Sequence, residues 1–162
     1  MRNRAVAAAV FAAALGVAFQ ATADDRDDRL VRFEGGIGVV PARVGGVANV
    51  VRGVNPGGQP WVISRLSADV RTDGRISVVG RGLLIAGGDA IATNAGQSVR
   101  ARLFCGAGTG TPFDSELVPL EPDGDFRIDG QLSGMPPAQC DRPVLLIVGG
   151  GGNWFAAGVP KQ

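Results

Sequence analysis

The chain contains 162 residues, of which 16 are basic and 15 acidic, and its formal net charge is +1. The arginines are spread along the chain and neither sign dominates, so the sequence lacks the dense basic patch that nucleic-acid binding needs. Histidine and tyrosine are absent, which excludes a Ser-His-Asp triad, a Cys-His pair and a histidine-ligated zinc site. The enzyme chemistry that remains uses paired carboxylates, as in glycoside hydrolysis.

The first 23 residues have the pattern of a secretory signal peptide. Arg2 and Arg4 precede an apolar run over residues 5–19, and small residues follow up to Ala23. We therefore expect cleavage after Ala23 and a secreted or periplasmic mature protein of bacterial origin. No later apolar stretch approaches the roughly 20 residues of a membrane helix, so no transmembrane segment is expected in the mature protein.

The remaining chain is expected to form one β domain over residues 30–162. Residues 24–29 are four aspartates and two arginines, which cannot bury apolar surface, so we expect a disordered charged terminus there. Beyond it, short aliphatic runs alternate with Gly, Pro, Asn and Asp, and the 26 glycines disfavour long helices. Besides two hairpins, strands are expected at 30–34, 47–51, 99–104, 143–148 and 154–159.

The first hairpin is predicted on either side of an Asp-Gly turn. Apolar and polar residues alternate over 62–70 and again over 76–84, so each strand has one buried and one wet face. Only a three-residue loop ending at Gly74 places the buried faces of the two strands on the same side of the hairpin, with Val70 opposite Ile76 and Ala68 opposite Val78. Gly74 then occupies the left-handed position of the turn, which favours glycine.

A second hairpin is predicted with the same turn chemistry. Its three-residue loop ends at Gly124 and would place Leu120 opposite Phe126 and Val118 opposite Ile128. The glycine and aspartate of both loops are explained by backbone geometry, so they do not indicate catalysis.

The pattern as a whole predicts an all-β fold of about eight strands. Residues 143–148 are almost continuously apolar and predict a strand buried on both faces, followed by a flexible glycine link over 149–152. We expect a two-sheet antiparallel β-sandwich of immunoglobulin-like or jelly-roll type, with a closed barrel as the alternative.

Cys105 and Cys140 are the only cysteines. In an exported protein such a pair predicts a disulfide. The alternative, a reactive thiol, would need an activating base, and the chain has no histidine and one lysine.

Four aromatic residues lie outside clean strand alternation: Trp61, Phe113, Trp154 and Phe155. Exposed aromatic rings stack on sugar rings, so these residues are the candidate ligand-binding set. The alternative is a place in the core, because large aromatics are usually highly buried.

Glu121, Asp123 and Asp125 form an acidic group at the second predicted turn. A bound Ca²⁺ would relieve their mutual repulsion, since calcium prefers several oxygen ligands on a flexible loop. The alternative is a solvated acidic turn. No other cofactor is expected.

These observations predict a secreted or periplasmic binding or accessory protein without catalysis of its own, whose ligand is an unknown protein or glycan. The first alternative is a carbohydrate or cell-wall binding module that uses exposed aromatics. The second is a carboxylate-dependent hydrolase. A sugar binder of that kind must expose a tryptophan, a hydrolase must hold two carboxylates across a cleft, and a protein-interaction module should present an apolar patch or an unpaired strand edge.

Overall fold

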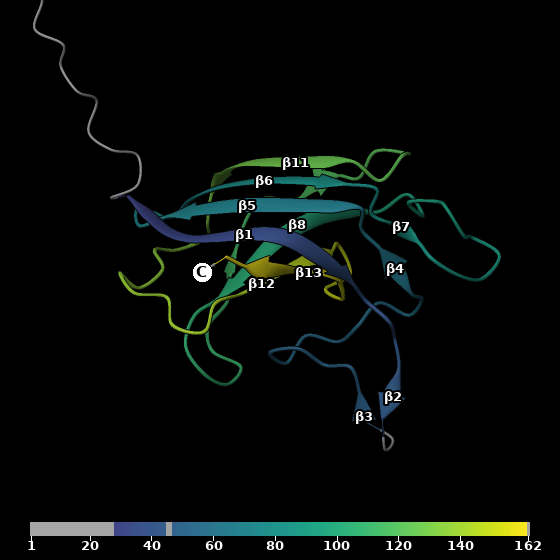
Figure 1. Ribbon diagram of the computed structural model, residues 1–162, viewed down its shortest axis with the longest axis horizontal. Coiled ribbons are helices and arrows are strands. Elements are labelled where there is room, and N and C mark those ends of the chain that lie inside the picture. The colour runs from purple at the N-terminus through teal and green to yellow at the C-terminus, as the bar shows by residue number, and fades with distance from the viewer. Residues whose placement is uncertain (1–27, 45–46, 162) are drawn as a thin grey trace, which may run out of the picture.

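A computed structural model describes residues 28–44 and 47–161. The predicted signal peptide, residues 1–23, and most of the charged segment 24–29 lie outside these described residues. Within them the protein has thirteen strands and no helix, which confirms the all-β prediction (Figure 1). The strands are β1 (Arg29–Gly38), β2 (Arg43–Val44), β3 (Val47–Ala48), β4 (Trp61–Val62), β5 (Arg65–Arg71), β6 (Arg75–Arg81), β7 (Leu84–Ile85), β8 (Ser98–Phe104), β9 (Phe113–Asp114), β10 (Val118–Pro119), β11 (Phe126–Gln131), β12 (Val144–Gly149) and β13 (Trp154–Pro160).

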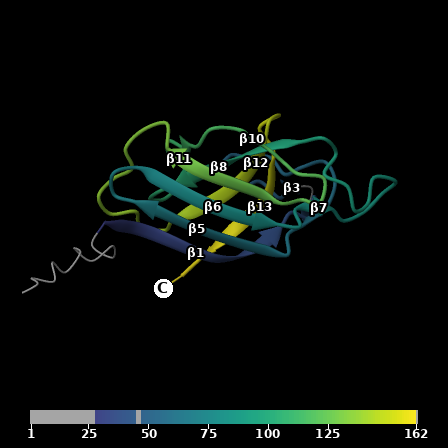
Figure 2. The same ribbon diagram turned by 90° about the horizontal axis from the view of Figure 1, so that it is seen from above.

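Eight strands form one curled antiparallel sheet in the order β10-β8-β12-β13-β1-β5-β6-β11. β1 pairs with both β13 and β5, so it joins two groups of strands that cross over one another (Figure 2). β9 pairs with β8, while β2–β3 and β4–β7 form small separate sheets. Because one strand connects both groups, the expected division into two sheets of immunoglobulin-like or jelly-roll type is not confirmed.

The core lies between the two crossing groups of strands. Phe33 on β1, Val78 on β6 and Leu103 on β8 are all fully buried there. β12 is buried on both faces, as predicted for residues 143–148. The segment between β3 and β4 packs against this part of the sheet: the Trp154 indole N–H donates to the Asn49 carbonyl, the Arg52 guanidinium donates to the Arg142 carbonyl just before β12, and Val54 joins the core.

The first predicted hairpin is confirmed in its register. Val70 pairs with Ile76 and Ala68 with Val78 across β5 and β6, and Gly74 has a φ of 82°. The chain bends after β6, so residues 61–62 and 84–85 continue the same register as β4 and β7 in a separate sheet. Val62 is consequently exposed, although the alternation predicts that it lies on the buried face.

The second hairpin is confirmed at its turn and wrong in its strands. The Glu121 N–H donates to the Asp125 carbonyl at 2.9 Å, and Gly124 has a φ of 83°. Beyond the turn, however, β10 pairs with β8 and β11 pairs with β6, so the expected ladder of Leu120 with Phe126 is absent from the described pairs, as is Val118 with Ile128. Pro119 lacks an N–H to donate, and β6 offers β11 a six-residue partner.

Two further expectations are corrected. The strand expected over 47–51 is limited to the two residues of β3. The glycine link at 149–152 is a hydrogen-bonded turn between β12 and β13, in which the Gly152 N–H donates to the Gly149 carbonyl at 2.9 Å.

The two turn glycines provide a matched stability test. An alanine Cβ at Gly74 would lie 2.8 Å from the end of the flexible Gln131 side chain, whereas at Gly124 it would lie 2.5 Å from the Leu83 backbone nitrogen. Gly74→Ala should therefore cost about 1 kcal/mol for the left-handed backbone alone. Gly124→Ala should cost about 2–3 kcal/mol, because a backbone shift is added. Equal losses in urea unfolding would contradict this packing argument.

Candidate functional site

The predicted aromatic set does not form an exposed platform in the described structure. Trp61, Trp154 and Phe155 are 5%, 4% and 7% exposed, and Phe113 is half-buried. Trp61 and Phe155 stack with ring centroids 4.2 Å apart and planes inclined by 12°. The Trp154 indole N–H donates to the Asn49 carbonyl at 3.1 Å. Stacking on a sugar requires a free ring face, so this arrangement favours the core alternative for both tryptophans.

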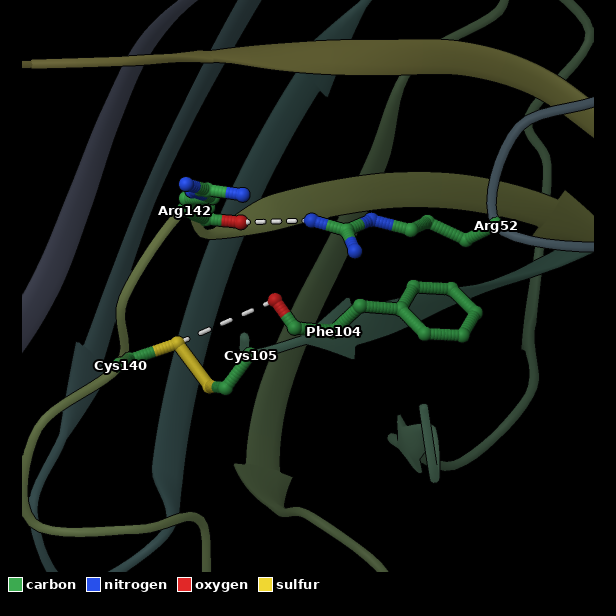
Figure 3. Close-up of a disulfide and its surroundings, with 5 residues drawn as sticks. All are labelled: Arg52, Phe104, Cys105, Cys140 and Arg142. Atoms are coloured by element: carbon green, nitrogen blue, oxygen red, sulfur yellow. Dashed lines mark hydrogen bonds between the residues drawn. A yellow bond between two sulfur atoms is a disulfide. The ribbon is translucent and has the colours of Figure 1, made fainter. Parts of the chain in front are cut away.

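The predicted disulfide between Cys105 and Cys140 is confirmed (Figure 3). It joins the loop after β8 to the loop before β12. The Arg52 guanidinium ties the same two loops together by donating to the carbonyls of Gly108 at 2.5 Å and Arg142 at 2.9 Å. This end of the molecule is therefore a covalent and hydrogen-bonded clamp with a structural role.

The predicted calcium ligands do not come together. Asp125 pairs with the Arg81 guanidinium at 2.9 Å and accepts from the Gly82 N–H at 3.0 Å. Asp123 accepts from the Asp125 N–H at 3.0 Å, as an ordinary turn aspartate does. In the part of the chain that the structure describes, no three acidic, cysteine or histidine side chains gather as metal ligands would. The arrangement of Glu121, Asp123 and Asp125 gives the calcium hypothesis no support.

The polar side chains that do converge lie on the outer face of β1, β5, β6 and β11, which we call the arginine face. Alternate residues of β5 and β6 point into the core, and the residues between them point to solvent. The register then aligns Asp69 with Ser77 and Ser77 with Asp129 across three strands.

The arginine face contains a hollow of about 610 Å³. Most of the residues that line it are charged or polar, although their aliphatic carbons, with Ile76 and Gly130, form more of the exposed wall than their polar atoms do. Seven charged or amide- and hydroxyl-bearing residues line it: Arg29, Asp69, Arg71, Arg75, Ser77, Asp129 and Gln131. The short serine side chain lies among long ones, which explains why the surface is hollowed there.

Hydrogen bonds and ion pairs fix the charged groups around this hollow. Arg29 pairs with Asp69 at 2.7 Å, and the Ser77 hydroxyl donates to Asp129 at 2.6 Å. The Ser77 hydroxyl and then the Arg127 guanidinium hold the pKa of Asp129 below its ordinary value. Asp129 is therefore anionic at neutral pH, and the hollow offers fixed donors and acceptors on a rigid sheet.

The Asp129 carboxyl provides a pH test of this arrangement. Ser77→Ala removes the main cause of the lowered pKa, so the pKa of Asp129 should rise toward its ordinary value. In the unmutated protein, the stabilisation from Asp129 is complete above the unfolded pKa of about 3.9 and is lost as pH falls through the lower folded pKa. Carbon-detected NMR titration of the carboxyl measures the shift, and an unchanged pKa in Ser77→Ala would contradict the assigned cause.

Sequence reasoning identified the wet faces of both strands but not the hollow. The sequence signal that could have indicated a charged face was that each of these strands begins and ends with an arginine. Arg65 and Arg71 are the ends of β5, and Arg75 and Arg81 are the ends of β6. The contributions of β1 and β11 depend on long-range pairing and carry no local signal.

The chain matches no protein family, no curated protein and no solved structure. Across residues 28–44 and 47–161, the structure contains no helix that could span a membrane.

Proposed function

We propose that this protein is an exported, non-catalytic binding protein whose ligand occupies the hollow on the arginine face. The observation that carries the proposal is the hollow of about 610 Å³ on four paired strands, which is lined mainly by charged and polar residues and is within the size range of ligand sites. A rigid sheet holds its donors and acceptors in place before the ligand arrives, which reduces the entropic cost of binding. The disulfide supports an oxidising compartment.

The state of the two carboxylates in the hollow supports binding over hydrolysis. A glycosidase needs one protonated acid beside one ionised carboxylate. Asp69 is paired with Arg29, and the lowered pKa of Asp129 keeps that carboxyl ionised. Asp129 is therefore not arranged as a proton donor at neutral pH.

The proposal can be tested by filling the hollow. Ser77→Trp places a large ring on its floor, at an outward strand position that suits an aromatic residue. Val62→Trp is the matched control, because Val62 is also an exposed strand residue but lies outside the hollow. The tagged proteins are recovered from the envelope and medium of the native host and examined by native mass spectrometry, with glycan and peptide arrays beside them.

We expect a ligand to accompany the unmutated protein and Val62→Trp and to be lost from Ser77→Trp. Equal retention by all three proteins would place the site elsewhere. A bare monomer in every fraction with no binding on either array would overturn the binding proposal. Turnover of an array glycan that disappears in Asp129→Asn would instead indicate the hydrolase.

A further inference from the structure

The arginine face contains two pairs of arginines that lie directly opposite each other on neighbouring strands. Arg65 pairs with Arg81 across β5 and β6, and Arg29 pairs with Arg71 across β1 and β5. Like charges in such positions destabilise a sheet. A chain that keeps both pairs on one face accepts a cost in folding stability, and such departures from local rules are typical of functional sites.

The positive charge of this face is not fully neutralised by the protein. Arg29 and Arg81 have carboxylate partners in Asp69 and Asp125. The Arg65 guanidinium, by contrast, forms no ion pair or hydrogen bond with the described residues, and its interaction with a carboxylate is limited to a Coulombic attraction that helps to lower the pKa of Glu34. Among the described residues of the face, seven arginines (29, 32, 65, 71, 75, 81 and 127) stand against five carboxylates (34, 69, 73, 125 and 129), and Arg71 is itself engaged in an interaction. The described part of the face therefore has a formal excess of positive charge, to which Arg65 contributes without an ion-pair partner.

The two arginine pairs lie at opposite ends of β5. Arg65 and Arg71 are six residues apart on this strand, which corresponds to about 20 Å at the usual rise per residue. Between them the face carries the short side chains of Ser67 and Ser77, with the half-buried Val79 opposite Ser67. A ligand that reaches both ends must be an extended chain with repeated negative groups.

The polar side chains between the arginines include both acceptors and donors. Asp69 and Asp129 can accept hydrogen bonds, and Gln131 and the serines can both donate and accept. Asp69 Oδ1 is buried without a hydrogen-bond donor in good geometry, although the Arg29 Nε lies 2.7 Å away. These groups suit hydroxyls, whereas the arginines suit carboxylates held in a bidentate manner.

We infer that the ligand is an acidic polysaccharide that lies along β5 and β6, with sugar carboxylates on the arginines at both ends and sugar hydroxyls on the polar groups between them. This inference rests on the proposed function. A nucleic acid fits less well, because no aromatic side chain lies on this face to stack with bases and its carboxylates repel phosphates. An acidic peptide supplies carboxylates but few hydroxyls.

The experiment measures binding of oligogalacturonates of two to ten sugars by calorimetry, with neutral galacto-oligosaccharides of equal length as the ligand control. We expect affinity to rise with length and then level off, and to fall with added salt. Arg65→Gln should weaken the ten-sugar ligand at least about tenfold and leave the two-sugar ligand unchanged. This loss corresponds to one charged hydrogen-bonded contact.

Arg142→Gln is the matched control, because Arg142 is exposed and lies at the disulfide end, where its backbone carbonyl makes the contact with Arg52. Arg65→Gln should also change the melting temperature little, since it removes both the repulsion with Arg81 and the attraction to Glu34. An affinity for the ten-sugar ligand equal to that of the unmutated protein would show that Arg65 is not a ligand contact.

The remaining outcomes separate this inference from the proposed function. If the unmutated protein binds a neutral ligand and Ser77→Trp does not, the hollow remains the binding site but the ligand is not an acidic polysaccharide. Binding of polyphosphate, single-stranded DNA or polyglutamate that equals or exceeds the binding of oligogalacturonate of matched length would also show that the ligand is not an acidic polysaccharide. Oligogalacturonate binding that survives both Ser77→Trp and Arg65→Gln would overturn the site itself.

Discussion

Replacing Cys105 and Cys140 together by serine is expected to lower the free energy of unfolding by about 4 kcal/mol. The two residues are 35 positions apart, and in the chain-entropy model a closed loop of that length removes this much conformational freedom from the unfolded chain. The folded strands on either side are already paired, since Val144 pairs with Phe104. We therefore expect the variant to fold and to unfold at a lower urea concentration.

The same variant should also loosen the clamp around the disulfide. The Gly106 N–H donates to the Asp141 carbonyl at 2.6 Å across the two joined loops, and Arg52 donates to both. Hydrogen exchange of the Gly106 amide should accelerate more than that of the amides in β12. The unmutated protein in reductant should reproduce the double variant. Identical urea midpoints with and without the disulfide would contradict the prediction.

Trp61→Ala is expected to cost about 3–5 kcal/mol, which is the usual range for truncating a buried aromatic. Trp61 is buried, stacks on Phe155 and fits against Gly57, where an added Cβ would lie 3.2 Å from the indole nitrogen. The cavity would open between β4 and β13. Urea unfolding followed by the fluorescence of the remaining tryptophan measures the loss.

This substitution also separates the core role of Trp61 from the sugar-binding one. A core residue lowers stability when truncated, whereas an exposed stacking residue lowers glycan affinity and leaves stability nearly unchanged. Trp61→Phe should recover most of the lost stability, because a phenyl ring can still stack on Phe155. A stable Trp61→Ala variant with weakened glycan binding would contradict the core role and support the hypothesis that Trp61 stacks on a sugar.

The correct predictions from sequence were those with local causes. The Gly74 turn was determined by two short alternating runs and one backbone conformation, so both its loop length and its register followed. The second turn shares that chemistry, and its Gly124 conformation also followed. Its strands did not, because the partners of β10 and β11 are β8 and β6, and competition among distant strands has no local signal.

The candidate site shows the same division. The outward position of Arg65, Ser67, Asp69 and Arg71 on one strand is readable from period-two alternation. That Asp129 would join them through Ser77 depends on β11 pairing with β6. Conversely, the aromatic residues that looked available for a ligand are buried, because the segment before β4 covers β13.

The sequence by itself therefore determined the β class, the disulfide, the first hairpin and the doubly buried strand, since each depends on residue type and short-range spacing. Only the tertiary structure decided that eight strands curl into one sheet and that four of them share a charged outer face. The physical reason is that strand pairing and face-to-face burial join residues far apart in the chain. The free energy that selects one such arrangement comes from the whole core rather than from any single segment.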